Sequence, residues 1–219
     1  DLFQSIHPHD YKPAPIFYGA IPRFFGVELE IDDGGHNDEN ARILLDTINT
    51  DAEYIYIKTD SSLRDGLEIV THPMTLDFHL HRFPWKQLLR TAVQLGYHAD
   101  DTDTCGLHIH VNRSSLGDFT EHQEATISRI LYFVEQHWNE LLKFSRRSES
   151  AMNRWAARYG YESSPKKLLD KAKERYGRYS AVNLCNHHTI EFRMVVPLID
   201  KSDGNGQPLP LYISPLEKK

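Results

Sequence analysis

The sequence predicts an α+β fold built on a mainly antiparallel sheet. Short segments alternate apolar and ionisable side chains at the two-residue period of a strand. Turn-forming residues join some of them as in hairpins, and helical patterns are inserted between others without a regular βαβ order. The segments are G-V-E-L-E-I (26–31), Y-I-K-T-D-S-S-L (56–63), G-L-E-I-V (66–70), C-G-L-H-I-H-V-N (105–112), R-Y-S-A-V-N-L (178–184) and T-I-E-F-R-M (189–194).

The first half of the chain reads as an arm followed by strands and one helix. Prolines and scattered aromatic residues predict an extended arm over 1–23. Strand 26–31 follows, then an acidic turn and a helix over 38–48. Strands over 53–58 and 66–71 flank a polar turn and form a hairpin-like unit.

The second half is richer in helix. We expect a helix over 84–95 ended by Gly96, and a long helix over 120–144 that starts at a capping box of Thr120 and Gln123. A further helix over 165–176 begins at Ser164-Pro165. The last strands are 179–184 and 189–195. The predicted organisation is an arm (1–23), one catalytic domain (24–197) and a turn-rich tail (198–219).

Composition and charge exclude several classes of protein. The sequence has no run of about 18 apolar residues, so we expect no membrane span. It shows no secretory signal pattern, so we expect a cytoplasmic protein. Its two cysteines, Cys105 and Cys185, are expected to be buried thiols. The net charge of −6 argues against non-specific nucleic-acid binding. The segment 143–178 is nevertheless basic, which suits a small anionic ligand or, alternatively, a solvated helical face.

Acidic and imidazole side chains share strand faces. Glu28 and Glu30 lie on one face, about 6–7 Å apart, which suits two neighbouring Mg²⁺ or Mn²⁺ ions. His108 and His110 share a face of their strand and could bind a metal. Either pair alone could equally be polar surface, and Glu68 alone is uninformative.

The last strand and the hairpin turn carry positively charged side chains as well as acidic ones. Glu191 could bind a metal while Arg193 binds a transferring phosphate through its planar fork, or the two could form an ordinary ion pair. Lys58 and Asp60 share a face before a turn that could simply be solvated. Taken together, the segments repeat one arrangement, with apolar residues on one side and Glu, His or Arg on the other. We therefore predict one sheet face that forms the floor of an active site.

Six ordered motifs carry a family resemblance. G-V-E-L-E-I, K-T-D-S-S-L, G-L-E-I-V-T-H-P, C-G-L-H-I-H-V-N, R-Y-S-A-V-N-L and T-I-E-F-R resemble the amidoligase family, carboxylate–amine ligases related to glutamine synthetase and glutamate–cysteine ligase. The similarity spans about 24–196. It implies a curved antiparallel sheet that forms a funnel with helices on its outer face, with ATP entering one end and the acceptor substrates the other.

The resemblance also implies roles for individual residues. Metal ligands would be Glu28, Glu30, Glu68, His108 and Glu191, and catalytic residues would be Arg193, Glu191 and Arg178. Nucleotide-binding residues would be His110, Lys58 and Asn183. The segment 145–177 matches no specificity signature, so the substrates are not implied.

The implied reaction uses ATP and Mg²⁺ (or Mn²⁺) to join a carboxylate to an amine through an acyl phosphate, with small molecules or peptides as substrates. Three alternatives stay open at this point. A phosphotransferase would give a phosphorylated product without an amide, a degenerate nucleotide-binding module would have no turnover, and a zinc hydrolase would act without ATP.

Overall fold

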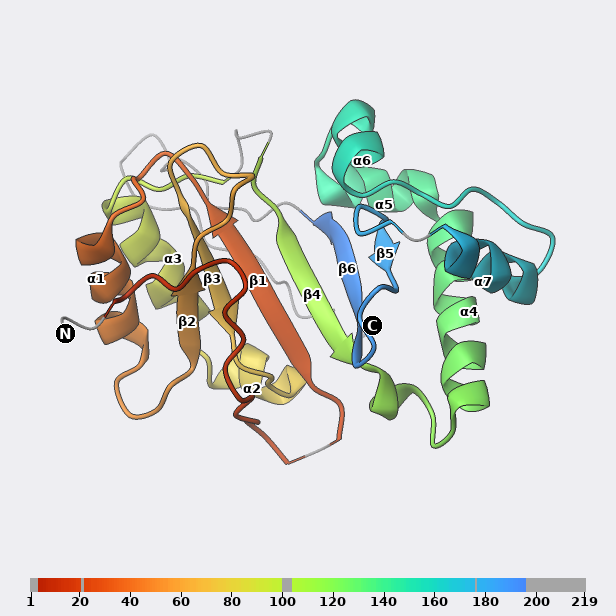
Figure 1. Ribbon diagram of the computed structural model, residues 1–219, viewed down its shortest axis with the longest axis horizontal. Helices are drawn as coiled ribbons and strands as arrows, with labels where there is room; N and C mark the ends of the chain where they lie inside the picture. The colour runs from red at the N-terminus through yellow and green to blue at the C-terminus, as the bar shows by residue number, and fades with distance from the viewer. Residues whose placement is uncertain (1–3, 21, 100–103, 176, 196–219) are drawn as a thin grey trace, which may run out of the picture.

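The computed structural model describes residues 4–20, 22–99, 104–175 and 177–195. Its sheet has six strands in the order β2-β3-β1-β4-β6-β5, and every pair of neighbours is antiparallel (Figure 1). The predicted α+β class with a mainly antiparallel sheet is therefore confirmed. The strands are β1 (Phe25–Ile31), β2 (Ile55–Lys58), β3 (Leu67–Thr71), β4 (Leu107–Asn112), β5 (Val182–Asn183) and β6 (Thr189–Val195).

The helices in the described residues are α1 (Asp38–Ile48), α2 (Leu76–His81), α3 (Trp85–Gln94), α4 (Thr120–Gln136), α5 (Trp138–Ser145), α6 (Glu149–Trp155) and α7 (Pro165–Glu174), with a short 3₁₀ helix η1 (Arg113–Leu116). Two of these helices, α2 and α6, were not predicted from the sequence. Asn37 caps α1 through its side chain, Gly96 follows α3 with a φ of 91°, and Ser164 caps α7. The predicted bounds of α1, α3 and α7 agree with the structure to within two residues.

Three predicted elements need correction. The helix expected over 120–144 is divided at His137, whose ψ of 26° ends α4 before α5 begins. The capping box at Thr120 and Gln123 is wrong, because the N-cap residue is Phe119 and no side chain caps the helix. The strand expected over 179–184 is only two residues long, since the Tyr179 carbonyl and the Ala181 N–H bond to Ala157 and only the Ala181 carbonyl before it accepts from β6.

The apolar face of the sheet carries the core. One cluster packs Leu29, Ile31, Leu67 and Ile69 under α1 and α3, and a second packs Val111, Ile190 and Met194 against α4 and α7. Helices α1, α3, α4 and α7 thus cover the outer, apolar face, and Figure 1 shows α3 behind the strands with α1 beside β2. Burial of the alternate strand residues therefore fixes the opposite set of side chains on the other face.

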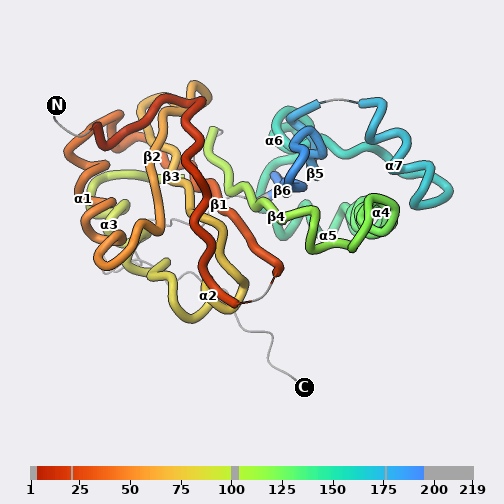
Figure 2. The backbone as a smooth tube through the Cα atoms, turned by 60° about the horizontal axis from the view of Figure 1, so that its bottom comes forward, coloured from red at the N-terminus to blue at the C-terminus, as the bar shows by residue number. Residues whose placement is uncertain are grey.

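The N-terminal arm lies against that other, polar face. A parallel bridge joins His7 to Lys58, and the tube in Figure 2 shows the dark red arm passing along β2, β3 and β1 on the side away from α1 and α3. The tail predicted over 198–219 lies outside the described residues. Of the two cysteines, Cys105 is buried as expected, whereas Cys185 is exposed.

No helix in the described ranges has the length and apolar character needed to cross a bilayer.

Candidate active site

The strand register brings the ionisable residues of distant segments into adjacent rows. Glu30 pairs with Glu68 across β1 and β3, and Glu28 pairs with His108 across β1 and β4. His110 pairs with Glu191 across β4 and β6. Directly opposed residues lie about 4.5–5.5 Å apart, so side chains from four strands come within reach of one another.

These polar side chains are buried, unlike those of a solvated sheet face. The exposed fraction is 3–7% for Glu30, Lys58, Glu68, His108, Asn183 and Glu191. The arm covers one side of the row, where the Lys58 ammonium donates to the carbonyl of His9. The segment after α5 covers the other, where Arg147 donates to the Cys105 carbonyl and Arg193 to the Trp155 carbonyl. Burying so many ionisable groups is costly, which indicates a functional site more than a structural one.

His108 stands at the centre of the carboxylates. Its Nδ1 atom lies 3.4 Å from Glu28 Oε2 and 3.5 Å from Glu191 Oε1. Glu30 Oε1 is 4.0 Å from the same atom. The C-G-L-H-I-H segment therefore places an imidazole among three carboxylates from β1 and β6.

Glu191 is held by residues on both sides. Asn183 donates to its Oε2 atom at 2.7 Å, and Arg193 Nη1 donates to its Oε1 atom at 2.6 Å. The Arg193 Nε–H also points at the Trp155 carbonyl, 3.4 Å away. Within the described part of the chain, Arg193 Nη2 has no hydrogen-bond partner, so this nitrogen can donate to a ligand.

Glu28, His110 and Glu191 form one group that could hold a metal ion. One ligand atom of each lies within 4.8 Å of the others. Burial raises the pKa of Glu28, but the imidazoles of His108 and His110 outweigh it and hold that pKa well below the usual range. Burial lowers the pKa of His110, yet Glu28 and Glu191 raise it more, so the net pKa is raised. A proton on His110 thus supplies the positive charge that these carboxylates attract.

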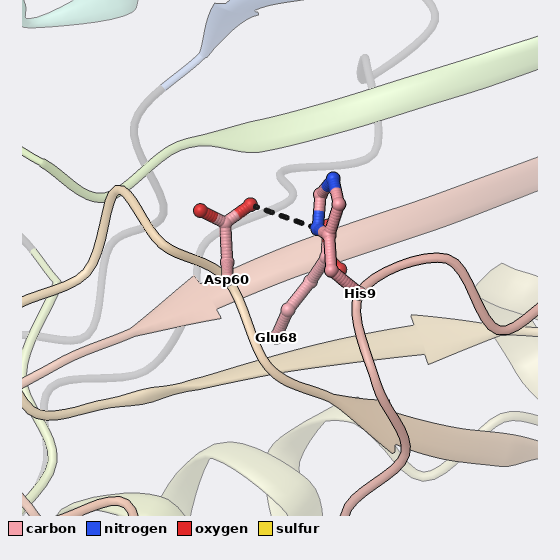
Figure 3. A group of neighbouring side chains, drawn as sticks. All are labelled: His9, Asp60 and Glu68. Atoms are coloured by element: carbon pink, nitrogen blue, oxygen red, sulfur yellow. Dashed lines mark ion pairs between the residues drawn. The ribbon is translucent and has the colours of Figure 1, made fainter.

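His9, Asp60 and Glu68 form a second group (Figure 3). His9 Nδ1 lies 3.9 Å from Asp60 Oδ2, and Glu68 reaches toward both from β3. The Lys58 ammonium is already 3.0 Å from Glu68 Oε2. Because that ammonium supplies a positive charge, this group is the weaker candidate for a metal.

Glu30 and Glu68 give up their protons less readily than ordinary carboxylic acids. Burial, with Asp60 and Glu68 nearby, raises the pKa of Glu30 from 4.5 to about 8. Burial and Glu28 raise the pKa of Glu68 to about 7, although Lys58 opposes the change. Closely packed acids that resist ionisation are typical of a site built for a multivalent cation.

The donor set fits hard divalent cations. It consists of carboxylate oxygens and imidazoles, without a thiolate, which suits Mg²⁺ or Mn²⁺. Two buried ligand atoms, Glu68 Oε2 and His110 Nε2, make no aligned hydrogen bond in the described structure. Lys58 Nζ lies 3.0 Å from the first atom and Glu28 Oε1 lies 3.3 Å from the second, so a bound cation would take the place of these ion pairs.

Three predicted nucleotide or catalytic residues have specific surroundings. Lys58 is engaged by Glu68, and Asn183 is engaged by Glu191. Arg178 is exposed, with its guanidinium 5.1 Å from the centre of the Tyr179 ring, over which Arg193 also lies at 5.6 Å. Arg178 thus lies at the edge of the site. Four of the five predicted metal ligands lie together with His110 in its centre, and the fifth, Glu68, belongs to the second group.

Sequence reasoning missed two residues of this face. His9 belongs to H-P-H in the arm, where nothing in the sequence connects it to Asp60. Arg147 was noticed only as one charge in the basic segment 143–178, yet its guanidinium reaches the start of β4. Both come from segments without strand periodicity, so only the folded chain shows where they lie.

A family model described as "Putative amidoligase enzyme" matches residues 40–204, about three quarters of the chain. The chain belongs to this amidoligase family. The family indicates an enzyme, and a ligase. The match includes Glu68, His108, His110, Glu191 and Arg193. The matched range begins after β1 and so does not include Glu28 or Glu30. These two residues lie beside matched residues because β1 pairs with β3 and β4. No curated protein matches the chain.

Proposed function

We propose that this protein is an ATP- and Mg²⁺-dependent ligase that joins a carboxylate to an amine through an acyl phosphate. The observation that carries the proposal is the buried convergence of Glu28, Glu30 and Glu191 on His108, with Arg193 beside Glu191. Such a set of carboxylates, imidazole and guanidinium suits phosphoryl transfer, where positioning and charge neutralisation supply most of the catalysis.

Two sets of residues would hold divalent ions. Glu28, Glu191, His108 and His110 surround one position, and Glu30 and Glu68 face another. When bound, Mg²⁺ neutralises charge on phosphate oxygens and orients them. Asn183 fixes the Glu191 carboxylate, and Glu191 in turn fixes the Arg193 fork.

The chain's own residues then act on the phosphoryl group. A carboxylate oxygen of the substrate attacks the γ-phosphorus, and the bond from phosphorus to the ADP oxygen breaks. Arg193 Nη2 would donate to an oxygen of the transferring group, and the arm and the segment after α5 would limit the access of water to the acyl phosphate. The amine attacks the acyl carbon and loses a proton, and phosphate leaves with one of the original carboxylate oxygens.

The cytoplasmic location expected from the sequence stays a prediction.

The test is ADP release from Mg²⁺-ATP with pooled carboxylates and amines, with products identified by mass. We expect ADP together with a product whose mass equals the two substrates minus water. Glu191→Gln should abolish both, and Glu140→Gln, on the exposed surface of α5, is the matched control that should leave both unchanged. ADP with a phosphorylated product would replace the ligase with a phosphotransferase, and no ADP from any pool would contradict the proposal.

A further inference from the structure

Arg147 is a half-buried cation that faces the site from the turn between α5 and α6. The preceding residue, Arg146, has a left-handed φ of 57° and is exposed, so the two neighbouring arginines lie in opposite environments. The Arg147 backbone N–H donates to the buried Ser145 hydroxyl at 3.2 Å. The turn therefore holds Arg147 inward while Arg146 stays in solvent.

Among the residues that the structure describes, no carboxylate forms an ion pair with the guanidinium of Arg147. Its Nη2 atom donates to the Cys105 carbonyl at 3.0 Å. Its Nε atom is buried and has no hydrogen-bond partner in the described ranges, and the nearby Glu30 acts on it only through space. Burial lowers the pKa of the guanidinium, yet an arginine keeps its charge in proteins. A half-buried cation without an ion pair is costly unless an anion arrives with a ligand.

Three functional atoms converge above Gly106, where no side chain stands. A Cβ atom placed on this glycine would lie 2.7 Å from His108 Nε2, 2.8 Å from Arg147 Nη2 and 3.1 Å from Glu30 Oε2. The glycine of the C-G-L-H-I-H segment thus leaves the space into which the guanidinium reaches. Arg147 comes to this point from a segment that carries no recognisable motif.

We propose that Arg147 binds an oxygen of the terminal phosphate of the nucleotide, as a second guanidinium beside Arg193. The identity of this anion rests on the proposed function. Phosphate oxygens are the ligands that divalent ions and arginine forks share, and Arg147 lies beside Glu30 and His108, which face those ions. A phosphate also carries more negative charge than a single carboxylate, which suits two guanidinium groups at one site.

The test is titration calorimetry of the full chain with Mn²⁺ and three probes: tripolyphosphate, AMP-PNP and AMP. Arg147→Ala should weaken tripolyphosphate and AMP-PNP binding at least tenfold and leave AMP binding within twofold. Arg146→Ala removes the same charge one residue away and should leave all three within twofold. Arg147→Lys, which keeps the charge and most of the packing, should stay several-fold weaker than the wild type because it lacks the fork.

Three results would overturn the inference: wild-type binding of tripolyphosphate by both Arg147 variants, an equal loss in Arg146→Ala, or no tripolyphosphate binding by the wild type. Failure of the proposed function looks different. If Arg147→Ala loses tripolyphosphate binding while the wild type forms no ADP with any substrate pool, the phosphate-binding role of Arg147 stands and the ligase activity does not. If the ligase is active and Arg147→Ala binds AMP-PNP normally, the ligase activity stands and the phosphate-binding role of Arg147 does not.

Discussion

Replacing Glu30 with glutamine should stabilise the metal-free protein at neutral pH while removing its activity. In the folded chain the pKa of Glu30 is raised from 4.5 to about 8 by burial and by the charges of Asp60 and Glu68. The folded state therefore holds this proton more tightly than the unfolded state does. Stability from Glu30 is complete below about pH 4.5 and is lost as the pH rises to 8, a total of about 5 kcal/mol.

Glutamine mimics the protonated acid and does not titrate. Between pH 5.5 and 7.5 the wild type should lose about 2.5 kcal/mol more unfolding free energy than Glu30→Gln. The assay is urea unfolding of both proteins at the two pH values in EDTA, with Glu140→Gln as the exposed control. Mg²⁺ should stabilise the wild type and not Glu30→Gln. A difference between the two proteins that stays constant with pH would refute the reasoning, because it would show that Glu30 titrates normally.

Four further predictions follow from the same contacts. Mn²⁺ binding at pH 7 should release about one to one and a half protons from Glu30 and Glu68, seen by calorimetry in buffers of different ionisation enthalpy; no release would contradict their raised pKa values. Asp32→Asn should lower the unfolding free energy by about 2 kcal/mol at pH 7, because its carboxylate accepts three backbone N–H groups and the Thr104 hydroxyl. Although burial opposes it, these bonds lower the Asp32 pKa, so the difference should shrink as the pH falls through that pKa; a difference independent of pH argues against an ionised Asp32. Gly106→Ala should weaken Mn²⁺ binding at least tenfold in calorimetry, since the new Cβ would displace His108 and Glu30, and unchanged affinity would show that these atoms do not converge on a cation. Arg193→Lys should lower kcat about 100-fold, about 3 kcal/mol of transition-state stabilisation, because an ammonium cannot reproduce the fork; near-normal kcat would remove Arg193 from phosphoryl transfer.

Strand periodicity was sufficient to predict the polar face. Alternation in 26–31, 105–112 and 189–194 assigns Glu28, His108 and Glu191 to the side opposite the core, and burial of Leu29 and Ile190 enforces that assignment. Periodicity does not specify which strands pair. The contact between β1 and β4 joins residues about 80 positions apart, and no local signal encodes it.

Local signals also miss elements whose ends or partners are tertiary. The apolar stripe of α4 continues through Trp138 into α5 without a proline or glycine, so the break at His137 has no marker in the sequence. The short helix α6 is capped by Ser148 and buries Met152 in the second core cluster. Arg147 and His9 reach the site from a turn and an arm, where side-chain direction follows no period.

The most direct test of the central claim follows oxygen atoms through the reaction. The carboxylate substrate found by the ADP assay is labelled with ¹⁸O in both oxygens and turned over with Mg²⁺-ATP and the amine. The account predicts that one ¹⁸O appears in the released phosphate and one stays in the amide, because the carboxylate attacks phosphorus and phosphate later leaves the acyl carbon. Phosphate without label would contradict an acyl phosphate and, with it, the mechanism assigned to this polar sheet face.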